Sequence, residues 1–282
     1  MTSRIAGVVG AGTMGNGIAQ VFAQAGFDVI MADVSQSALD RGLAAISNSL
    51  SRLVKKGTLS DSQAVLILSR IRGCTQLAEL AACELVVEAA TENAQIKEKI
   101  FRELASIVPA STILASNTSS ISLTTIAAWV AAPERVIGMH FMNPVPVMQL
   151  VEIIRALQTS DDTHARIHAL SLELGKTPVT VKDGAGFVSN RVLMPMINEA
   201  AFVLYENLAA AEDIDTVMKL GMNHPIGPLA LADLIGLDTC LSIMDILYRE
   251  FRDSKYRACP LLVQLVAAGH LGRKSGKGFY RY

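Results

Sequence analysis

The sequence predicts an α/β fold: a Rossmann-like, doubly wound, mostly parallel sheet, followed by a smaller all-α C-terminal domain. Three observations predict it. Short β-branched runs alternate with longer amphipathic stretches in the first two thirds of the chain, a glycine-rich turn directly follows the first run, and no convincing strand appears in the last third. Strands that alternate with helices at this spacing form parallel sheets that helices cover on both faces.

The predicted strands are short and rich in Val, Ile and Leu. They are Ile5–Val9, Val29–Met31, Leu85–Glu88, Ile113–Ala115 and Val136–Met139, followed by Leu150–Ile154 and Val179–Val181 near an edge of the sheet. Amphipathic patterns between the strands predict helices, of which the clearest are Met14–Ala25, Ser35–Lys56 and Asn93–Ile107.

After the glycine-bearing segment 182–186 the pattern is helical throughout. The predicted helices are Ser189–Asn207, Ala211–Leu220, Pro228–Phe251 and Pro260–Ala268. We therefore place the boundary at about residue 184, between a nucleotide-binding domain, 1–184, and a helical C-terminal domain, 185–282. A chain of 282 residues is long enough for two domains of this kind.

The C-terminal helices are apolar over much of their circumference. One such face consists of Val192, Leu193, Met196, Ile197 and Ala200. Helices of this kind are either enclosed or packed against another subunit. We therefore expect a two-fold symmetric homodimer whose interface is built from residues after about 187. The alternative is a monomer whose helices fold back onto residues 1–184.

Composition excludes several classes of protein. Lys and Arg number 25 against 26 Asp and Glu, whereas nucleic-acid binders carry a basic excess. The uncharged stretch 5–27 contains six glycines and several polar side chains, so it is no membrane span, and its apolar run is too short for a signal peptide. The cysteines form no CxxC pair and no metal-ligand spacing, so we expect reduced thiols, a cytoplasmic protein and no bound metal. They are Cys74, Cys83, Cys240 and Cys259.

The glycine-rich turn consists of Gly10, Ala11, Gly12, Thr13, Met14 and Gly15, between the first strand and an apolar helix. In this context GxGxxG is typical of dinucleotide sites, because the glycines permit a tight turn, close approach of a diphosphate and close packing of the helix. Asp33 stands where an acid binds the adenosine ribose hydroxyls, and no Lys or Arg in 34–39 offsets its charge. NAD is therefore predicted over NADP. The alternative is a structural turn with Asp33 as a helix cap.

A second group of polar residues belongs to two later strands. His140 stands at the end of the run Val136–Met139, and Glu152 lies within the apolar strand Leu150–Ile154, where an unpaired carboxylate is costly to bury. Two strands joined by a Pro-rich turn can bring them together as a general base and its orienting anion. From the residues alone, His140 is equally well a satisfied core side chain.

Two further groups carry weaker signals. The run Ser116–Ser120 follows a strand, where its hydroxyl and amide groups can bond a carbonyl or an alcohol, although helix capping is the simpler interpretation. His164 and His168 lie one helical turn apart without a third ligand. For these histidines we expect a solvated helix face and no metal site.

Motifs along essentially the whole chain resemble the L-3-hydroxyacyl-CoA dehydrogenase family, in order and at family spacing. They are Gly10–Gly15, Ala115–Ser119, Gly138–Pro144, Gly186–Phe187 with Asn190–Arg191, Asn223–Pro228 and Gly272–Tyr280. The chain is most similar to the stand-alone bacterial members that act on 3-hydroxybutyryl-CoA. The resemblance implies reversible hydride transfer between NAD and C3 of an (S)-3-hydroxyacyl-CoA, and a dimer formed through the C-terminal domain.

The resemblance also implies a role for each matching position. His140 matches the catalytic base, and Glu152 its partner carboxylate. Ser119 matches a contact to the substrate's 3-oxygen and the nicotinamide region, and Asn190 a contact near the substrate carbonyl. The cofactor positions that it adds are Glu92, Lys97, Asn117, Asn143 and Lys274, and those for the CoA moiety are Ser49 and Lys56. Without the resemblance, Lys56 is equally a solvated helix end.

Two positions depart from the family pattern. Met142 stands where the family usually has a second Phe, and Ala185 where it usually has Pro, which frees the hinge before Asn190.

Two other functions are compatible with a dinucleotide-binding fold: a dehydrogenase of a free hydroxy acid or sugar acid, and a non-catalytic dinucleotide-binding protein. The intact set of Ser119, His140, Glu152 and Asn190 speaks against the non-catalytic protein.

Overall fold

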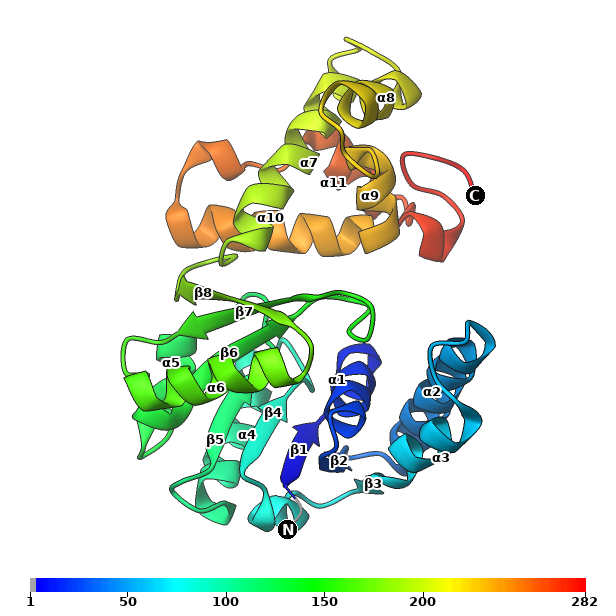
Figure 1. Cartoon of the computed structure of the whole chain (residues 1–282). Coiled ribbons are helices and arrows are strands. Elements are labelled where there is room, and N and C mark those ends of the chain that lie inside the picture. Colours follow the sequence, from blue (N-terminus) through cyan, green and yellow to red (C-terminus); the bar gives the residue numbers. More distant parts are fainter. Residues whose placement is uncertain (1–3) are drawn as a thin grey trace. The chain divides into compact units, whose positions relative to one another are not determined.

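The structure, a computed structural model, describes residues 4–282 (Figure 1). The chain forms two compact units, of which the first ends at Asp183 and the second spans Gly184–Tyr282. Each unit encloses a hydrophobic core of its own. Within the described residues, no helix combines the length and the apolar character needed to cross a membrane.

The first unit is built on a sheet that has eight strands in the part of the chain described, in the order β3-β2-β1-β4-β5-β6-β7-β8. The strands are β1 (Ile5–Val9), β2 (Asp28–Ala32), β3 (Ile71–Cys74), β4 (Leu85–Glu88), β5 (Ile113–Ser116), β6 (Val136–Phe141), β7 (Leu150–Arg155) and β8 (Thr177–Lys182). Neighbouring strands are parallel except β6 and β7, which are antiparallel. Because β1 lies between β2 and β4, the turn after β1 stands where the strand order reverses, the usual ligand position in such sheets.

The helices of the first unit connect these strands. They are α1 (Thr13–Gln24), α2 (Gln36–Lys55), α3 (Asp61–Ser69), α4 (Ala94–Ile107), α5 (Leu123–Ala127) and α6 (Asp161–Glu173), with 3₁₀ helices η1 (Leu77–Ala82) and η2 (Pro133–Arg135). Helices α2 to α6 each begin at a Ser or Asn whose side chain accepts a hydrogen bond from the first turn. Helix α1 begins at Gly12, with no side-chain cap, which leaves amide groups available at its N-terminus.

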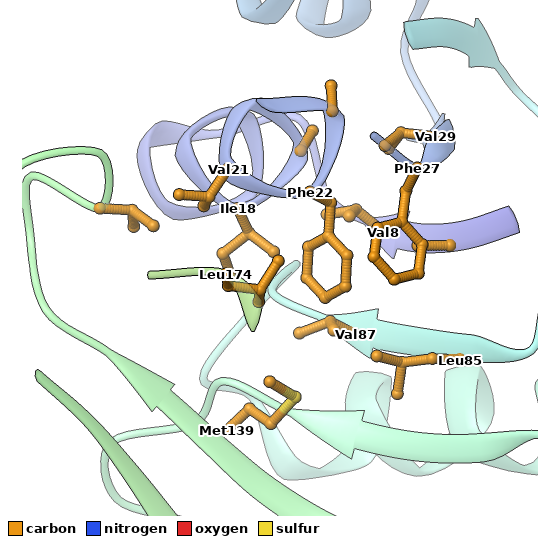
Figure 2. Close-up of a cluster of buried hydrophobic side chains, with 14 of the residues drawn as sticks. Val8, Ile18, Val21, Phe22, Phe27, Val29, Leu85, Val87, Met139 and Leu174 are labelled. Atoms are coloured by element: carbon orange, nitrogen blue, oxygen red, sulfur yellow. The ribbon is translucent and has the colours of Figure 1, made fainter. Parts of the chain in front are cut away.

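Packing of α1 on the sheet fixes the position of the glycine-rich turn. Figure 2 shows Phe22 of α1 beside Phe27 and Val8 of β1, with Val87 of β4 below the Phe22 ring. The rings of Phe22 and Phe27 meet edge to face, with centroids 5.3 Å apart. Alternate strand residues point to this face because the side-chain period of a strand is two. The same cluster includes Leu174 just after α6, so α1 and α6 cover the same face of the sheet.

The second unit is built of helices and connecting loops, and its described residues form isolated β-bridges but no named strand. Its helices are α7 (Ser189–Tyr205), α8 (Ala211–Gly221), α9 (Pro228–Ile235), α10 (Leu237–Phe251) and α11 (Pro260–Ala267), with 3₁₀ helices η3 (Ser254–Tyr256) and η4 (Arg273–Ser275). A buried carboxylate on α9 holds the end of the chain: Asp233 accepts hydrogen bonds from the backbone N–H groups of Phe279 and Tyr280, both at 2.9 Å.

The predicted α/β fold and its seven predicted strands are confirmed, and three details differ. Strand β6 extends to Phe141, so His140 lies within the strand and not at its end. The sequence analysis missed β3 and α3 (Figure 1), of which β3 carries the exposed pair Arg72 and Gly73 and lacks an apolar run. The single predicted helix Pro228–Phe251 is wrong, because Gly236, with φ of +104°, ends α9 before α10 begins.

Candidate active site

The turn between β1 and α1 presents its backbone to a pocket of about 390 Å³. Gly10 has a φ of +103°, and a Cβ on Gly15 would lie 1.8 Å from the carbonyl oxygen of Gly10, so both positions require glycine. A Cβ on Gly12 would meet no atom within 4 Å, because Gly12 borders open space. An uncapped helix N-terminus beside such a space fits the diphosphate of a dinucleotide. The other lining residues are Ala11, Thr13, Asn16, Asp33, Ala38, Arg41, Gly42, Ala45 and Ala90.

Asp33 follows β2 directly and lies between two pockets. Its carboxylate accepts hydrogen bonds from the backbone N–H of Ala11 at 2.9 Å and of Ser35 at 3.1 Å. The N-cap of α2 is Ser35, so the interpretation of Asp33 as that cap is wrong. The second pocket, of about 210 Å³, has apolar walls that include Val34, Leu77, Ile96 and Ile100. An apolar cleft beside a carboxylate fits an adenosine, with the base in the cleft and the ribose at the acid.

A third pocket, of about 280 Å³, lies between Met14 of α1 and the loops that follow β4 and β5. Glu92, from the first loop, holds the second: its carboxylate accepts hydrogen bonds from Ser119 N–H at 2.7 Å, Ser119 Oγ at 2.9 Å and Thr118 Oγ1 at 2.7 Å. Because the Ser119 hydroxyl donates to Glu92, its oxygen keeps lone pairs for a donor on a ligand. Asn117 lines this pocket, and its Oδ1 accepts from the N–H of Phe141 at 2.9 Å.

Beneath this third pocket lies a buried ion pair between Glu88, at the end of β4, and Lys97 of α4. The side chains of Glu88 and Lys97 are 0% and 1% exposed. The Glu88 carboxylate also accepts from Ser116 Oγ at 2.9 Å and from Ala90 N–H at 2.9 Å. Lys97 therefore reaches the wall of the pocket with its charge already compensated. The sequence analysis assigned no role to Glu88, although Glu88, like Glu152, belongs to an apolar strand where an unpaired carboxylate is costly.

His140 and Glu152 are brought together by the antiparallel pairing of β6 and β7. They are direct partners in the ladder, and Nδ1 of His140 lies 2.8 Å from Oε2 of Glu152. Both lie on the face opposite to Met139 and Ile153, which belong to the α1 core. A histidine held at Nδ1 by a buried carboxylate has the arrangement of a general base with an oriented ring.

The loop between β6 and β7 carries Asn143 and is held by Lys176. The Lys176 ammonium donates to the carbonyl oxygens of Val145 at 2.6 Å and Met148 at 2.8 Å, and its burial lowers its pKa. Val145 in turn packs on α1, since a Cβ on Gly17 would lie 2.8 Å from Val145 Cβ. Lys176, which the sequence analysis did not single out, thus fixes the loop beside the glycine-rich helix.

The remaining predicted site residues lie elsewhere in the two units. Ser49 is half-buried on α2, and Lys56 is the exposed C-cap of that helix, before Gly57 with φ of +72°. In the second unit, Asn190 lies in the first turn of α7, and Lys274 of η4 donates to Asp238 at 2.7 Å. His164 and His168 lie on α6, and within residues 4–282 no group of three His, Cys, Asp or Glu side chains is placed to hold a metal.

Comparisons with known proteins give one consistent result. Residues 5–184 match the model of "3-hydroxyacyl-CoA dehydrogenase, NAD binding domain", and residues 186–282 match that of "3-hydroxyacyl-CoA dehydrogenase, C-terminal domain". A probable 3-hydroxybutyryl-CoA dehydrogenase of Deinococcus radiodurans is 56% identical over 98% of this chain and 99% of its own length. The 3-hydroxybutyryl-CoA dehydrogenase of Bradyrhizobium diazoefficiens is 52% identical over 98% of this chain and 94% of its own.

A solved structure gives the same relationship in three dimensions. The crystal structure of (S)-3-hydroxybutyryl-CoA dehydrogenase from Ralstonia eutropha is similar to this chain with a TM-score of 0.96 and 56% sequence identity. The match covers 100% of this chain and 99% of that one. Both units therefore have counterparts in one known structure.

Proposed function

The chain belongs to the 3-hydroxyacyl-CoA dehydrogenase family, whose first domain binds NAD, and we propose that it transfers hydride reversibly between NAD and C3 of (S)-3-hydroxybutyryl-CoA. The oxidised partner would be acetoacetyl-CoA. The observation that carries this proposal is the buried pair of His140 and Glu152, 2.8 Å apart, in a chain whose relatives carry the name of this activity. It supplies a general base for the hydroxyl proton that leaves with the hydride.

Each proposed catalytic group has a defined task. The residues of the glycine-rich turn and Asp33 would hold NAD, which would supply the hydride acceptor in oxidation and the hydride donor in reduction. His140 takes the proton of the 3-hydroxyl in oxidation and gives it back in reduction. Glu152 keeps a proton on Nδ1, which leaves Nε2 as the acceptor, and stabilises the imidazolium that forms. Ser119, with its own proton directed at Glu92, offers an acceptor to the N–H groups of the cofactor amide, because the single proton of the 3-hydroxyl goes to His140.

We propose ligand contacts for the other predicted residues. Support for the cofactor positions comes from the three pockets, which Gly10, Gly12, Thr13, Asp33, Glu92 and Asn117 line. Lys97, paired with Glu88, contributes to the wall of the third pocket. We assign Asn143 and Lys274 to the cofactor by family position alone. On the same ground Ser49 and Lys56 contact CoA phosphates, and Asn190 contacts the substrate carbonyl.

An absorbance assay at the NADH band tests the activity. The unmodified chain is expected to oxidise NADH with acetoacetyl-CoA and to show little activity with free acetoacetate. His140→Gln should lower kcat by about 10²- to 10⁴-fold, the usual contribution of a positioned acid–base group. His164→Gln, on α6, is the matched control and should leave kcat unchanged.

Two outcomes would exclude the proposal in different ways. Faster turnover of free acetoacetate than of its CoA ester would favour a dehydrogenase of free hydroxy acids. No turnover of any of these substrates, with NADH still bound, would leave a non-catalytic dinucleotide-binding protein. A near-normal kcat of His140→Gln would exclude His140 as the general base but would leave the assignment of the CoA ester as substrate intact.

We also propose that the second unit dimerises and that the protein is cytoplasmic. Support for the dimer comes from apolar side chains exposed on α7 and α8, with Val192 66%, Val217 60% and Leu220 82% exposed. Light scattering should give twice the 30.1 kDa mass of one chain, and one-chain mass with full activity would contradict the dimer.

Support for the cytoplasmic compartment comes from four free, buried cysteines, and imaging of the tagged chain in its native cell tests this location.

A further inference from the structure

One face of α2 borders the pocket beside the glycine-rich turn. Ala38, Arg41, Gly42 and Ala45 line this pocket, at the spacing of a single helix face. Gly42 lets the helix approach closely, since a Cβ there would lie 2.8 Å from the carbonyl oxygen of Ala11. The three small residues leave the space that the pocket occupies, and Arg41 is the basic side chain among its described lining residues.

The Arg41 guanidinium has no ion pair or side-chain hydrogen bond to any residue in the range 4–282 that the structure describes. The acids beside it are otherwise engaged: Asp33 accepts from the backbone of Ala11 and Ser35, and Asp40 accepts from Gln36 Nε2 at 2.9 Å. Other arginines of this unit, including Arg4 and Arg102, are paired with carboxylates. Arg41 is therefore a cation at the edge of a pocket with its donors available.

We propose that Arg41 binds the diphosphate of the NAD cofactor. A guanidinium presents paired donors that match two phosphate oxygens, and the pocket's other donors are the uncapped amides at the start of α1. The diphosphate carries two negative charges, and Asp33 adds a third in the same lining, so a cation there reduces the mutual repulsion of these charges.

The pocket geometry favours the diphosphate over a 2′-phosphate on the adenosine ribose. Arg41 shares its pocket with Gly12, Thr13 and Asn16 of the turn. The apolar pocket on the other side of Asp33, which fits the adenosine, has Val34 in its lining and lacks Arg41. The ribose hydroxyls would lie at Asp33 between them. Arg41 should therefore act equally on NAD and NADP, and it does not reverse the preference set by Asp33.

The test is direct binding of NADH and NADPH to the whole chain, by fluorescence titration without acyl-CoA. Arg41→Gln should weaken binding of both dinucleotides by about 10-fold, the size of one charge-assisted hydrogen bond. Arg41→Lys should recover part of the loss, because it keeps the charge without the paired donors. Arg52→Gln, on the same helix but outside the pocket lining, should leave both dissociation constants unchanged.

The possible outcomes separate cleanly. A loss confined to NADPH would assign Arg41 to a 2′-phosphate and overturn the proposal, as would unchanged binding of both dinucleotides. The inference depends on the proposed function only through its cofactor, so acetoacetyl-CoA reduction is measured in parallel. A chain that binds NADH through Arg41 but has no turnover would refute the proposed activity and not this contact. A chain that binds no NADH would refute both.

Discussion

His140 and Glu152 face each other across the one antiparallel ladder in the described sheet, with Nδ1 2.8 Å from Oε2. Direct cross-strand neighbours have their Cβ atoms about 5 Å apart, so the contact follows from the strand register. The two side chains are only 9% and 3% exposed, which strengthens the interaction and restricts the ring to one orientation. A parallel β7 would have required a long crossover connection between the two residues.

Glu152→Gln should therefore reduce catalysis without dismantling the strand pair. The amide can turn its NH₂ group toward Nδ1, which makes Nδ1 an acceptor and places the ring proton on Nε2, the wrong tautomer for a base. We expect kcat to fall by about 10²-fold or more in both directions, with a smaller change in KM. Steady-state kinetics measure this, with NADH and acetoacetyl-CoA in one direction and NAD and (S)-3-hydroxybutyryl-CoA in the other, and the exposed Glu134→Gln is the control. An unchanged kcat would mean that Glu152 has only a structural role.

Cofactor preference should depend on the charge of Asp33. Asp33→Asn keeps an oxygen that can accept from Ala11 N–H but removes the repulsion of a 2′-phosphate. The unmodified chain should prefer NADH, and in the variant the ratio of kcat/KM for NADH to that for NADPH should narrow by roughly 10-fold. Asp40→Asn is the control, because Asp40 lies on α2 outside the lining of the pocket that contains Asp33. Equal use of NADPH by the unmodified chain would overturn the prediction.

Much of the fold could be predicted because its signals are local. The strand Ile5–Val9 and the turn after it combine an apolar run with glycines at required positions. The edge strand β3 gives no such signal, since its two central residues, Arg72 and Gly73, face solvent. The break between α9 and α10 was missed because a glycine within an apolar pattern does not reveal its φ, and Gly236 adopts +104°.

The candidate site was predictable only in part. Strand periodicity placed His140 and Glu152 in neighbouring strands, but their register depends on the loop between them. Arg41 was not predicted, because it lies beyond residues 34–39, the segment directly after Asp33, and only the helical spacing of α2 brings it to the pocket. Lys176 bonds carbonyls of a loop about thirty residues earlier, and long-range contacts of this kind leave no local pattern.

The four cysteine thiols should be unreactive in the folded protein. Burial raises the pKa of Cys83 to about 12 and that of Cys240 to about 12, and it also raises the pKa of Cys74 and Cys259. Because the thiolate is the nucleophile and forms only above the pKa, labelling near pH ~8 should be very slow. A disulfide-exchange reagent should titrate the thiols only after urea unfolding. Rapid labelling of any thiol in the native chain would contradict this burial.

The pair of Glu88 and Lys97 should be strongly coupled, because neither charge can reach water. Lys97→Met leaves the Glu88 carboxylate buried with only neutral donors, from Ser116 and Ala90, and should cost about 3–5 kcal/mol in the free energy of unfolding. Glu88→Gln leaves the ammonium uncompensated and should cost a similar amount.

The double variant Glu88→Gln/Lys97→Met removes both charges, and the amide oxygen of Gln still accepts from Ala90. It should be more stable than the sum of the single losses predicts, by at least 1–2 kcal/mol. Urea unfolding measures this cycle, and the exposed pair Glu98 and Arg102 on the same helix is the matched control, where coupling should be below ~1 kcal/mol. Additive losses at Glu88 and Lys97 would mean that water reaches the pair. NADH titration of the double variant then separates stability from function. If cofactor binding at the third pocket depends on the charges of Glu88 and Lys97, the double variant will bind NADH more weakly than the unmodified chain, even though its fold is restored.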